Sequence, residues 1–153
     1  MKAVVQLVSR ASVSVGPETV GAIGPGLLIL LGVGRADTEK EARYLAEKIA
    51  ALRIFPDHNG QMNRSAVDVG GEFLVVSQFT LYGDCRKGRR PSYNQAASPE
   101  MAKCLYLYFA EYLKKFGCPV SCGQFQAAME VHLINQGPVT IILDSDKTPL
   151  AVS

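Results

Sequence analysis

The segment "GLLILLGVG", residues 26–34, decides the fold, because it is apolar almost without interruption between its glycines. A strand with one face in water alternates apolar and polar residues, whereas a strand covered on both faces reads as a continuous apolar run. We therefore predict a central strand here, with packed layers of structure on both sides of it.

The sequence on either side of this strand carries further signals. "KAVVQLVSRASVSV", residues 2–15, alternates loosely with β-branched residues and predicts an opening strand that ends at Gly16-Pro17. Thr38 and Glu41 have the spacing of a capping box, which predicts the start of a helix. Apolar residues repeat behind it at helical intervals and predict a face packed on the core, made of Ala42, Leu45, Ile49 and Leu52.

The second half of the chain repeats this alternation of strand and helix. "EFLVVSQFTLYGD", residues 72–84, predicts a second strongly apolar strand. Ser98 as N-cap and Pro99 at the first helical position predict a helix that ends near Gly117. One side of this helix is predicted to carry Met101, Leu105, Tyr108 and Tyr112. Two strands close the chain, "AAMEVHLI" at 127–134 and "PVTIIL" at 138–143.

The resulting order, ββαββαββ, predicts a mixed-sheet α/β/β layered fold with two main helices rather than a simple Rossmann unit. A length of 153 residues, 48% of them apolar, suits one domain that spans residues 1–153. No phosphate-binding glycine motif is present, so we expect no nucleotide cofactor.

Composition sets limits on partners and location. No apolar run approaches the roughly 18 residues of a membrane-spanning helix, and no charged head with an apolar signal core opens the chain. We expect a cytoplasmic protein without membrane contact, in which the four cysteines are reduced thiols. Cys118 and Cys122 have roughly the spacing of one ligand pair of a zinc site, but no second Cys/His pair follows at metal-finger spacing, so we expect no metal. The formal charge of +2 is too small to indicate nucleic acid by itself.

The usual side chains of acid-base catalysis are scarce. His58 lies in the turn "DHNG", residues 57–60, and His132 points away from the apolar face of its strand, so we expect both to be exposed. Cys104 is expected to be a small packing residue of the second helix. Cys85 stands beside Arg86, which favours the thiolate, but no positioned base is visible.

Two hydroxyl residues of the second strand raise a different possibility. Ser77 and Thr80 would face opposite sides of an ideal strand, because side chains alternate with period two. If both serve one pocket, the strand must end or bulge around Gln78 and Phe79, which frees backbone N–H groups for an anionic or polarised ligand oxygen. The alternative is that both are ordinary residues of a strand end.

A second unusual feature is a Gly-Pro pair inside "LINQGPVTIILDS", residues 133–145, which otherwise reads as a buried strand. Proline has no donor for a sheet ladder and restricts the residue before it. The pair therefore predicts a corner in the chain, with a tight turn at the start of a strand as the simpler interpretation.

Together, "SQFT" at 77–80 and "NQGPVT" at 135–140 resemble the paired motifs of the D-aminoacyl-tRNA deacylase family. The resemblance covers nearly the whole chain, because "AVVQLVSRASVSV", "IGPGLLILLGVG", "KIAALRIFPD", "KGRRPSY" and "LDS" also look like family sequence in family order. Two departures are Gln136, where the family usually has aspartate, and the lack of an acidic residue before Met129.

The resemblance implies a cytoplasmic homodimer that deacylates D-aminoacyl-tRNA and also acts on glycyl-tRNA. It implies a cis Gly137-Pro138 bond that reaches from one subunit into the pocket of the other. The catalytic residues would be Ser77, Gln78, Phe79 and Thr80, and the residues of chiral selection Asn135, Gly137, Pro138, Val139 and Thr140.

We further expect the carbonyls of the Gly-Pro corner to hold the substrate amino group and leave no room for an L side chain. The substrate's own 2′-hydroxyl would assist hydrolysis, with freed N–H groups stabilising the oxyanion. The segment "RKGRR" places Arg86, Lys87, Arg89 and Arg90 where they could contact tRNA phosphates, with a solvated loop as the alternative. Two other functions stay open: an RNA-binding module that does not cleave its ligand, and a cysteine hydrolase centred on Cys85.

Overall fold

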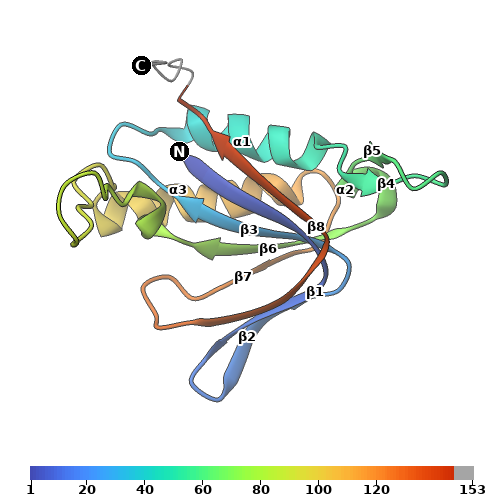
Figure 1. The fold of residues 1–153 in the computed structure, drawn as a ribbon, viewed down its shortest axis with the longest axis horizontal. Coiled ribbons are helices and arrows are strands. Elements are labelled where there is room, and N and C mark those ends of the chain that lie inside the picture. Colours follow the sequence, from blue (N-terminus) through green and yellow to red (C-terminus); the bar gives the residue numbers. More distant parts are fainter. Residues whose placement is uncertain (147–153) are drawn as a thin grey trace.

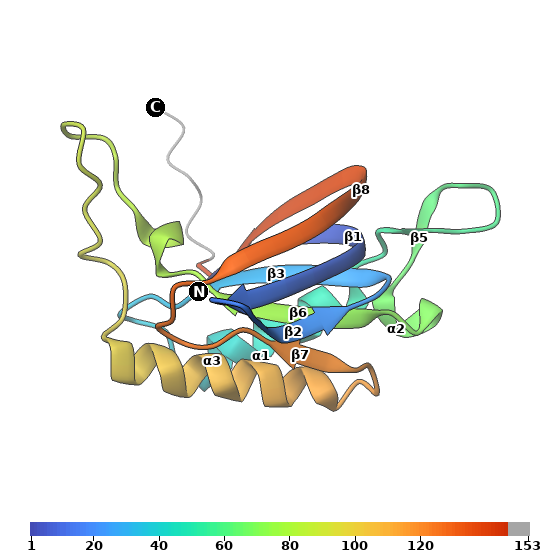
Figure 2. The same ribbon diagram turned by 90° about the horizontal axis from the view of Figure 1, so that it is seen from below.

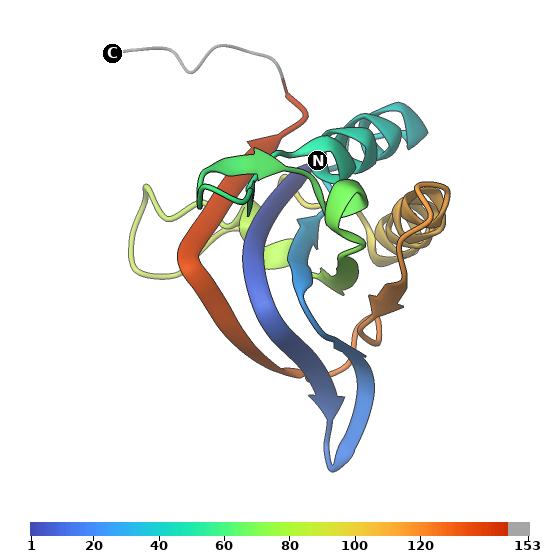
Figure 3. The same cartoon turned by 90° about the vertical axis from the view of Figure 1, so that its right-hand side faces the viewer.

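The computed structural model describes residues 1–146, so the last seven residues of the predicted domain lie outside the described part. The main sheet has the strand order β2-β1-β3-β6-β7, with β8 on the other edge of β1, and is strongly curved (Figures 1 and 3). Its strands are β1 (Lys2–Val15), β2 (Glu18–Ile23), β3 (Gly26–Gly32), β6 (Glu72–Ser77), β7 (Val120–Cys122) and β8 (Glu130–Asp144). A small ribbon of β4 (Phe55–Pro56) and β5 (Met62–Arg64) lies beside the short helix α2 (Ala66–Val69).

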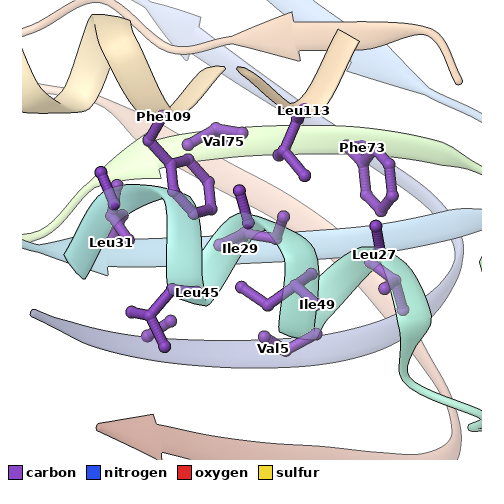
Figure 4. Close-up of a cluster of buried hydrophobic side chains, with 14 of the residues drawn as sticks. Val5, Leu27, Ile29, Leu31, Leu45, Ile49, Phe73, Val75, Phe109 and Leu113 are labelled. Carbon is purple, nitrogen blue, oxygen red and sulfur yellow. The ribbon is translucent and has the colours of Figure 1, made fainter. Parts of the chain in front are cut away.

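Strand β3 is the centre of the molecule, as its continuous apolar sequence predicts. It pairs antiparallel with β1 and parallel with β6. Leu27, Ile29 and Leu31 face the larger hydrophobic cluster under the helices (Figure 4). Leu28 points to the other face, into a smaller cluster formed inside the curl of the sheet. Burial of both faces is therefore confirmed, and so is the mixed α/β class.

The curl of the sheet brings its two ends close to each other. Ser121 of β7 donates its hydroxyl to the carbonyl of Ala22 in β2 at 3.2 Å. A Cβ added at Gly21 would lie only 2.6 Å from the Cys122 carbonyl oxygen, so glycine is what permits this approach. The result is a nearly closed sheet whose inner face holds the smaller cluster.

The two long helices, α1 (Glu39–Ala51) and α3 (Pro99–Lys114), cover the same face of the sheet (Figure 2). The predicted capping box is confirmed, because the Thr38 N–H donates to the Glu41 carboxylate at 2.8 Å. Ser98 caps α3 as predicted. The predicted side of α3 is confirmed in part, because Leu105 is buried and Met101, Tyr108 and Tyr112 pack against the core. The centre of the buried face is rotated from it by part of a turn, and the buried residues are Ala102, Leu105, Tyr106, Phe109, Ala110 and Leu113.

The error on α3 also affects three individual residues. Tyr108 and Tyr112 lie at the margin of the core and are only partly buried. Cys104, expected to be a packing residue, is exposed. The physical reason is that the helix packs with the row through Phe109 against the sheet, which turns its neighbours toward solvent.

The closing strands also differ from the prediction. Residues 130–134 and 138–143 belong to one strand, β8, which pairs with β1, whereas residues 127–129 lie before the strand. It is not a buried strand, because only its inward side packs on the core, while Ile134 and Ile142 are 47% and 78% exposed. The predicted strand 72–84 is also too long: β6 ends at Ser77.

The parallel pairing of β3 with β6 generates a stability prediction. Gly26 lies opposite Glu72, and a Cβ at Gly26 would meet the Glu72 carbonyl oxygen at 2.0 Å. Backbone atoms on both strands would have to shift, so we expect Gly26→Ala to lower the free energy of unfolding by about 3 kcal/mol. Gly24→Ala is the matched control, because nothing lies within 4 Å of its added Cβ. Equal midpoints of urea-induced unfolding for the two variants would contradict the close packing of β3 against β6 at Gly26.

Candidate active site

The chain leaves the sheet abruptly after Ser77. Gln78 makes the last sheet contact, donating its N–H to the Leu31 carbonyl at 2.8 Å, and a single 3₁₀ turn, η1 (Phe79–Tyr82), follows. Leu81 N–H donates back to the Gln78 carbonyl at 3.2 Å. The N–H groups of Phe79 and Thr80 have no acceptor within residues 1–146. The predicted break around Gln78 and Phe79 is therefore confirmed, together with donors that a ligand oxygen could use.

Two glycines at the end of β3, Gly32 within the strand and Gly34 just after it, form the surface on which η1 packs. A Cβ at Gly32 would lie 3.0 Å from the Gln78 carbonyl oxygen and 3.1 Å from the Leu81 Cβ. A Cβ at Gly34 would lie 2.6 Å from the Tyr82 hydroxyl. Both glycines lie within the apolar segment quoted first, but their role depends on a tertiary contact and has no signal in the sequence.

A cavity of about 550 Å³ opens beside Ser77, Gln78 and Phe79. The rest of its lining is mainly apolar and comes from β3, α3 and the segment that leads into β8: Leu31, Val33, Val76, Ala97, Pro99, Ala102, Tyr106, Phe125, Gln126, Ala127, Met129 and Val131. No histidine or carboxylate lies among these described residues. The cavity therefore offers an apolar wall and backbone donors, but no side-chain general base.

Tyr106 holds two segments of the cavity wall together. Its hydroxyl donates to the Val75 carbonyl at 2.9 Å and lies 3.5 Å from the Gly123 carbonyl oxygen. Burial raises the pKa of this phenol well above its usual value, so it stays a neutral donor. The bond ties β6 to the segment that carries Phe125 into the cavity.

The side chains of the SQFT motif are arranged for support rather than for attack. The Gln78 side-chain amide donates to the Thr80 hydroxyl oxygen. Ser77 is half-buried, and the Phe79 ring is 58% exposed and packs edge-on against Tyr93 with centroids 5.1 Å apart. Within residues 1–146 no base is positioned to activate the Thr80 hydroxyl.

The Gly-Pro corner is an outward bulge of β8. Val8 pairs with Asn135 and Gln6 with Thr140, so residues 136–139 lie opposite Leu7 alone. The Gly137-Pro138 peptide bond is cis, and Gly137 has φ +117°. The corner is exposed to solvent at both residues.

Asn135 and Thr140 fasten the two ends of this corner. The Asn135 side-chain oxygen accepts the N–H of Val139 at 3.1 Å, and its amide nitrogen donates to the Thr140 hydroxyl oxygen at 2.9 Å. The Gln6 side-chain amide also donates to Thr140, at 3.3 Å. The residues predicted for chiral selection therefore form one hydrogen-bonded unit.

The two motifs do not meet within one chain. β8, β1, β3 and β6 are successive strands, and three strand spacings amount to about 14 Å. Ser77 is also in register with Leu31, Ala3 and then Leu143, several residues beyond the Gly-Pro corner along β8. Figure 3 shows β8 on the far side of the sheet from the helices, with β1 and β3 between it and β6.

The remaining predicted residues differ in their environments. Arg86 is bound to the Asp84 carboxylate at 2.9 and 2.6 Å, an ion pair that holds the pKa of Asp84 far below its usual range. Lys87, Arg89 and Arg90 are exposed on a loop that projects beyond the strand ends (Figure 2). Cys85 is exposed, and His58 and His132 are exposed as predicted.

Comparisons with known proteins show the family to which this chain belongs. Residues 4–144 match the sequence profile of the family described as D-Tyr-tRNA(Tyr) deacylase. The chain belongs to this family. A D-aminoacyl-tRNA deacylase of Desulforudis audaxviator is 60% identical over 147 residues, covering 96% of this chain and 99% of the relative. One of Roseiflexus sp. (strain RS-1) is 63% identical over 145 residues, covering 95% and 94%. The predicted family and enzyme class, a hydrolase, are confirmed.

Solved structures share the fold. One described as "c-Myc DNA Unwinding Element Binding Protein" has a TM-score of 0.90 at 46% identity and covers 95% of this chain and 99% of its own. A probable eukaryotic D-amino acid tRNA deacylase has a TM-score of 0.79 at 18% identity, covering 93% and 97%. Within the described residues of this deacylase family member, no helix is long and apolar enough to cross a membrane.

Proposed function

We propose that this protein hydrolyses the ester bond of D-aminoacyl-tRNA, releasing free tRNA and the D-amino acid, as a quality-control step of translation in the cytoplasm. The observation that carries the proposal is the pair of N–H groups of Phe79 and Thr80, which have no acceptor within residues 1–146 and lie beside the apolar cavity. An ester has a good leaving group, so a held carbonyl, a placed water and oxyanion donors suffice to accelerate its cleavage.

No side-chain base lines the cavity within residues 1–146, so we assign the proton transfer to the substrate. In the proposed mechanism water attacks the acyl carbon as the ester C–O bond breaks, and the neighbouring 2′-hydroxyl of the terminal ribose accepts the water proton while it passes its own proton to the departing 3′-oxygen. Ser77 and Gln78 position the substrate, and Gln78 also supports Thr80 through its side-chain amide. Thr80 thus supports the pocket and is not a nucleophile, so no acyl-enzyme forms on it.

The chiral filter is assigned to the Gly-Pro corner of a second copy of the chain. The corner is exposed and lies too far from Ser77 in its own chain, while β8 pairs within residues 1–146 with β1 alone and exposes Ile134 and Ile142. A homodimer formed over this face covers the apolar side chains and brings one corner to the other subunit's cavity. Fixed backbone carbonyls there hold the α-amino group and exclude an L side chain, while D side chains and glycine fit.

The loop of residues 86–90 is assigned to the tRNA backbone. Lys87, Arg89 and Arg90 are exposed beside η1, and Arg86 is held by Asp84 at the loop base. Phosphate contacts of this kind position RNA without reading its sequence.

A binding function without cleavage is the second candidate. The neighbour described as a DNA unwinding element binding protein is 46% identical, and the basic loop suits any nucleic acid backbone. This candidate predicts retention of intact aminoacyl-tRNA. A cysteine hydrolase is less well supported, because Cys85 is exposed on the loop and does not line the cavity.

The first test is release of amino acid from matched D-, L- and glycyl-tRNA. We expect rapid loss of the D and glycyl esters, with the L ester untouched. Gly137→Ala should lower D cleavage about 100-fold, because a Cβ there would meet the Val139 Cγ2 at 2.7 Å and displace the corner. Gly16→Ala is the control, since this glycine also has a positive φ but its Cβ meets nothing within 4 Å. Tight binding of all three tRNAs without release would replace the deacylase by the binding function.

A second test addresses the proton acceptor. D-aminoacyl-tRNA with a 2′-deoxy terminal ribose should be hydrolysed at least about 100-fold more slowly, because its only proposed base is removed. Single-turnover rates on the two substrates measure the difference. Equal rates, or an acyl group found on Thr80 by mass spectrometry, would refute substrate assistance.

A third test addresses the basic loop. Neutralising Lys87, Arg89 and Arg90 together should weaken tRNA binding and reduce the slope of log affinity against log salt by about 2, since each phosphate contact on single-stranded RNA contributes roughly 0.7. Neutralising Arg43, Lys48 and Lys103 provides a charge-matched control at exposed positions of the two long helices. If the slope stays at the wild-type value, the tRNA backbone contacts another surface.

A further inference from the structure

A second cavity lies directly on the other side of η1. Its volume is about 1070 Å³, and it lies between the first residues of β1, the end of β8, the start of α1 and the residues after η1. These segments gather at the left of Figure 1, where the basic loop also begins. Phe79 lines the smaller cavity and Tyr82 the larger one, so three residues of 3₁₀ turn, about 6 Å, separate them.

The short distance between the two cavities suits the proposed substrate. The reacting ester lies on the last nucleotide of a single strand, and the nucleotides before it must leave the smaller cavity. The larger cavity is next to it at the same end of the sheet, beyond the carboxyl ends of parallel β3 and β6. Its volume is at the upper end of small-molecule pockets, which leaves room for more than one nucleotide.

The cavity wall offers two kinds of group that suit an unstacked base. Tyr44, 37% exposed, presents an aromatic ring, and single-stranded bases stack on such rings. The half-buried Tyr82 ring carries the Lys2 ammonium group 5.0 Å from its centroid. Asp144 lies on the wall as an exposed carboxylate. Its Oδ1 accepts the N–H of Asp146 at 3.0 Å, and its Oδ2 has no donor within residues 1–146. A carboxylate accepts a hydrogen bond from the amino group of cytosine, which uracil lacks.

The other carboxylates on the cavity wall are Asp37, Glu41, Asp84 and Asp146, and Glu41 accepts hydrogen bonds from the Thr38 N–H and hydroxyl. Asp37 accepts from the Met1 ammonium group at 2.5 Å and from the Gly34 N–H at 2.6 Å. Asp84 is paired with Arg86. These pairings lower the repulsion of phosphates, and the lining also supplies cations from Lys2, Arg35 and Lys40.

We propose that this second cavity binds cytidine nucleotides of the single-stranded 3′ end of the substrate, with Tyr44 as the stacking surface and Asp144 as the acceptor for the cytosine amino group. The inference rests on the proposed function, because that function places the strand end at η1. It makes the enzyme read the nucleotides that precede the reacting one.

The test measures binding and cleavage separately. Binding uses fluorescein-labelled oligoribonucleotides that end in CCA or in UUA, followed by fluorescence anisotropy. We expect CCA to bind at least about fivefold more tightly, the lower limit for one discriminating base contact. Asp144→Ala should abolish the difference, and Tyr44→Ala should weaken CCA binding at least about fivefold by loss of stacking. Leu107→Ala, a large exposed side chain on α3, is the control and should change nothing.

Cleavage is measured on the D-tyrosyl ester of adenosine, which lacks the preceding nucleotides. All three variants should cleave it like the wild type. Equal affinity for CCA and UUA, or a preference that survives Asp144→Ala, overturns the cytidine site whether or not the ester is cleaved. A cytidine preference without cleavage of any D ester supports the site and overturns the deacylase, so the two failures are distinguishable.

Discussion

Burial of β3 on both faces is the constraint on which the rest of the structure depends. A strand with Leu27, Leu28 and Ile29 fully inside needs apolar layers on either side. The helices α1 and α3 supply one layer, and the curl of β1, β2 and β8 around the smaller cluster supplies the other. The parallel neighbour β6 is held in register with β3 from Gly26 to Leu31, which brings both strand ends to the same edge.

That edge is where the proposed chemistry lies. Because β6 stops at Ser77 while the chain turns back over Gly32 and Gly34, backbone N–H groups are released at a fixed place beside an apolar cavity. Ligands of α/β sheets generally bind outside the carboxyl ends of parallel strands. The proposed site uses backbone donors and, within residues 1–146, no side-chain base, which suits an ester that carries its own neighbouring hydroxyl.

Local signals in the sequence were sufficient for several elements. The capping box of Thr38 and Glu41 and the N-cap Ser98 fixed both helix starts, because capping depends on residues within one turn. The end of the strand after Ser77 was indicated by Ser77 and Thr80, because their side chains would face opposite sides of an ideal strand. The resemblance of the SQFT and NQGPVT segments to family motifs supplied the residues that we propose for the site.

Tertiary features could not be predicted in the same way. The exposure of Ile142 depends on β8 lying at a sheet edge, and the exposure of Cys104 depends on the rotation of α3 about its axis. The surface formed by Gly32 and Gly34 depends on contacts with residues almost fifty positions away in the chain. The separation of the two motifs within one chain became visible only from the strand order.

The central claim is that an active site combines η1 of one chain with the Gly-Pro corner of another, and a mixing experiment tests it most directly. Phe79→Pro removes one proposed oxyanion donor at a helical position that tolerates proline, and Gly137→Ala displaces the corner. Each variant alone should be inactive on D-aminoacyl-tRNA. After unfolding and refolding together, random pairing should restore about a quarter of wild-type activity, because half of the dimers contain one intact site of two. A mixture as inactive as its components would show that the site does not draw its two halves from different chains.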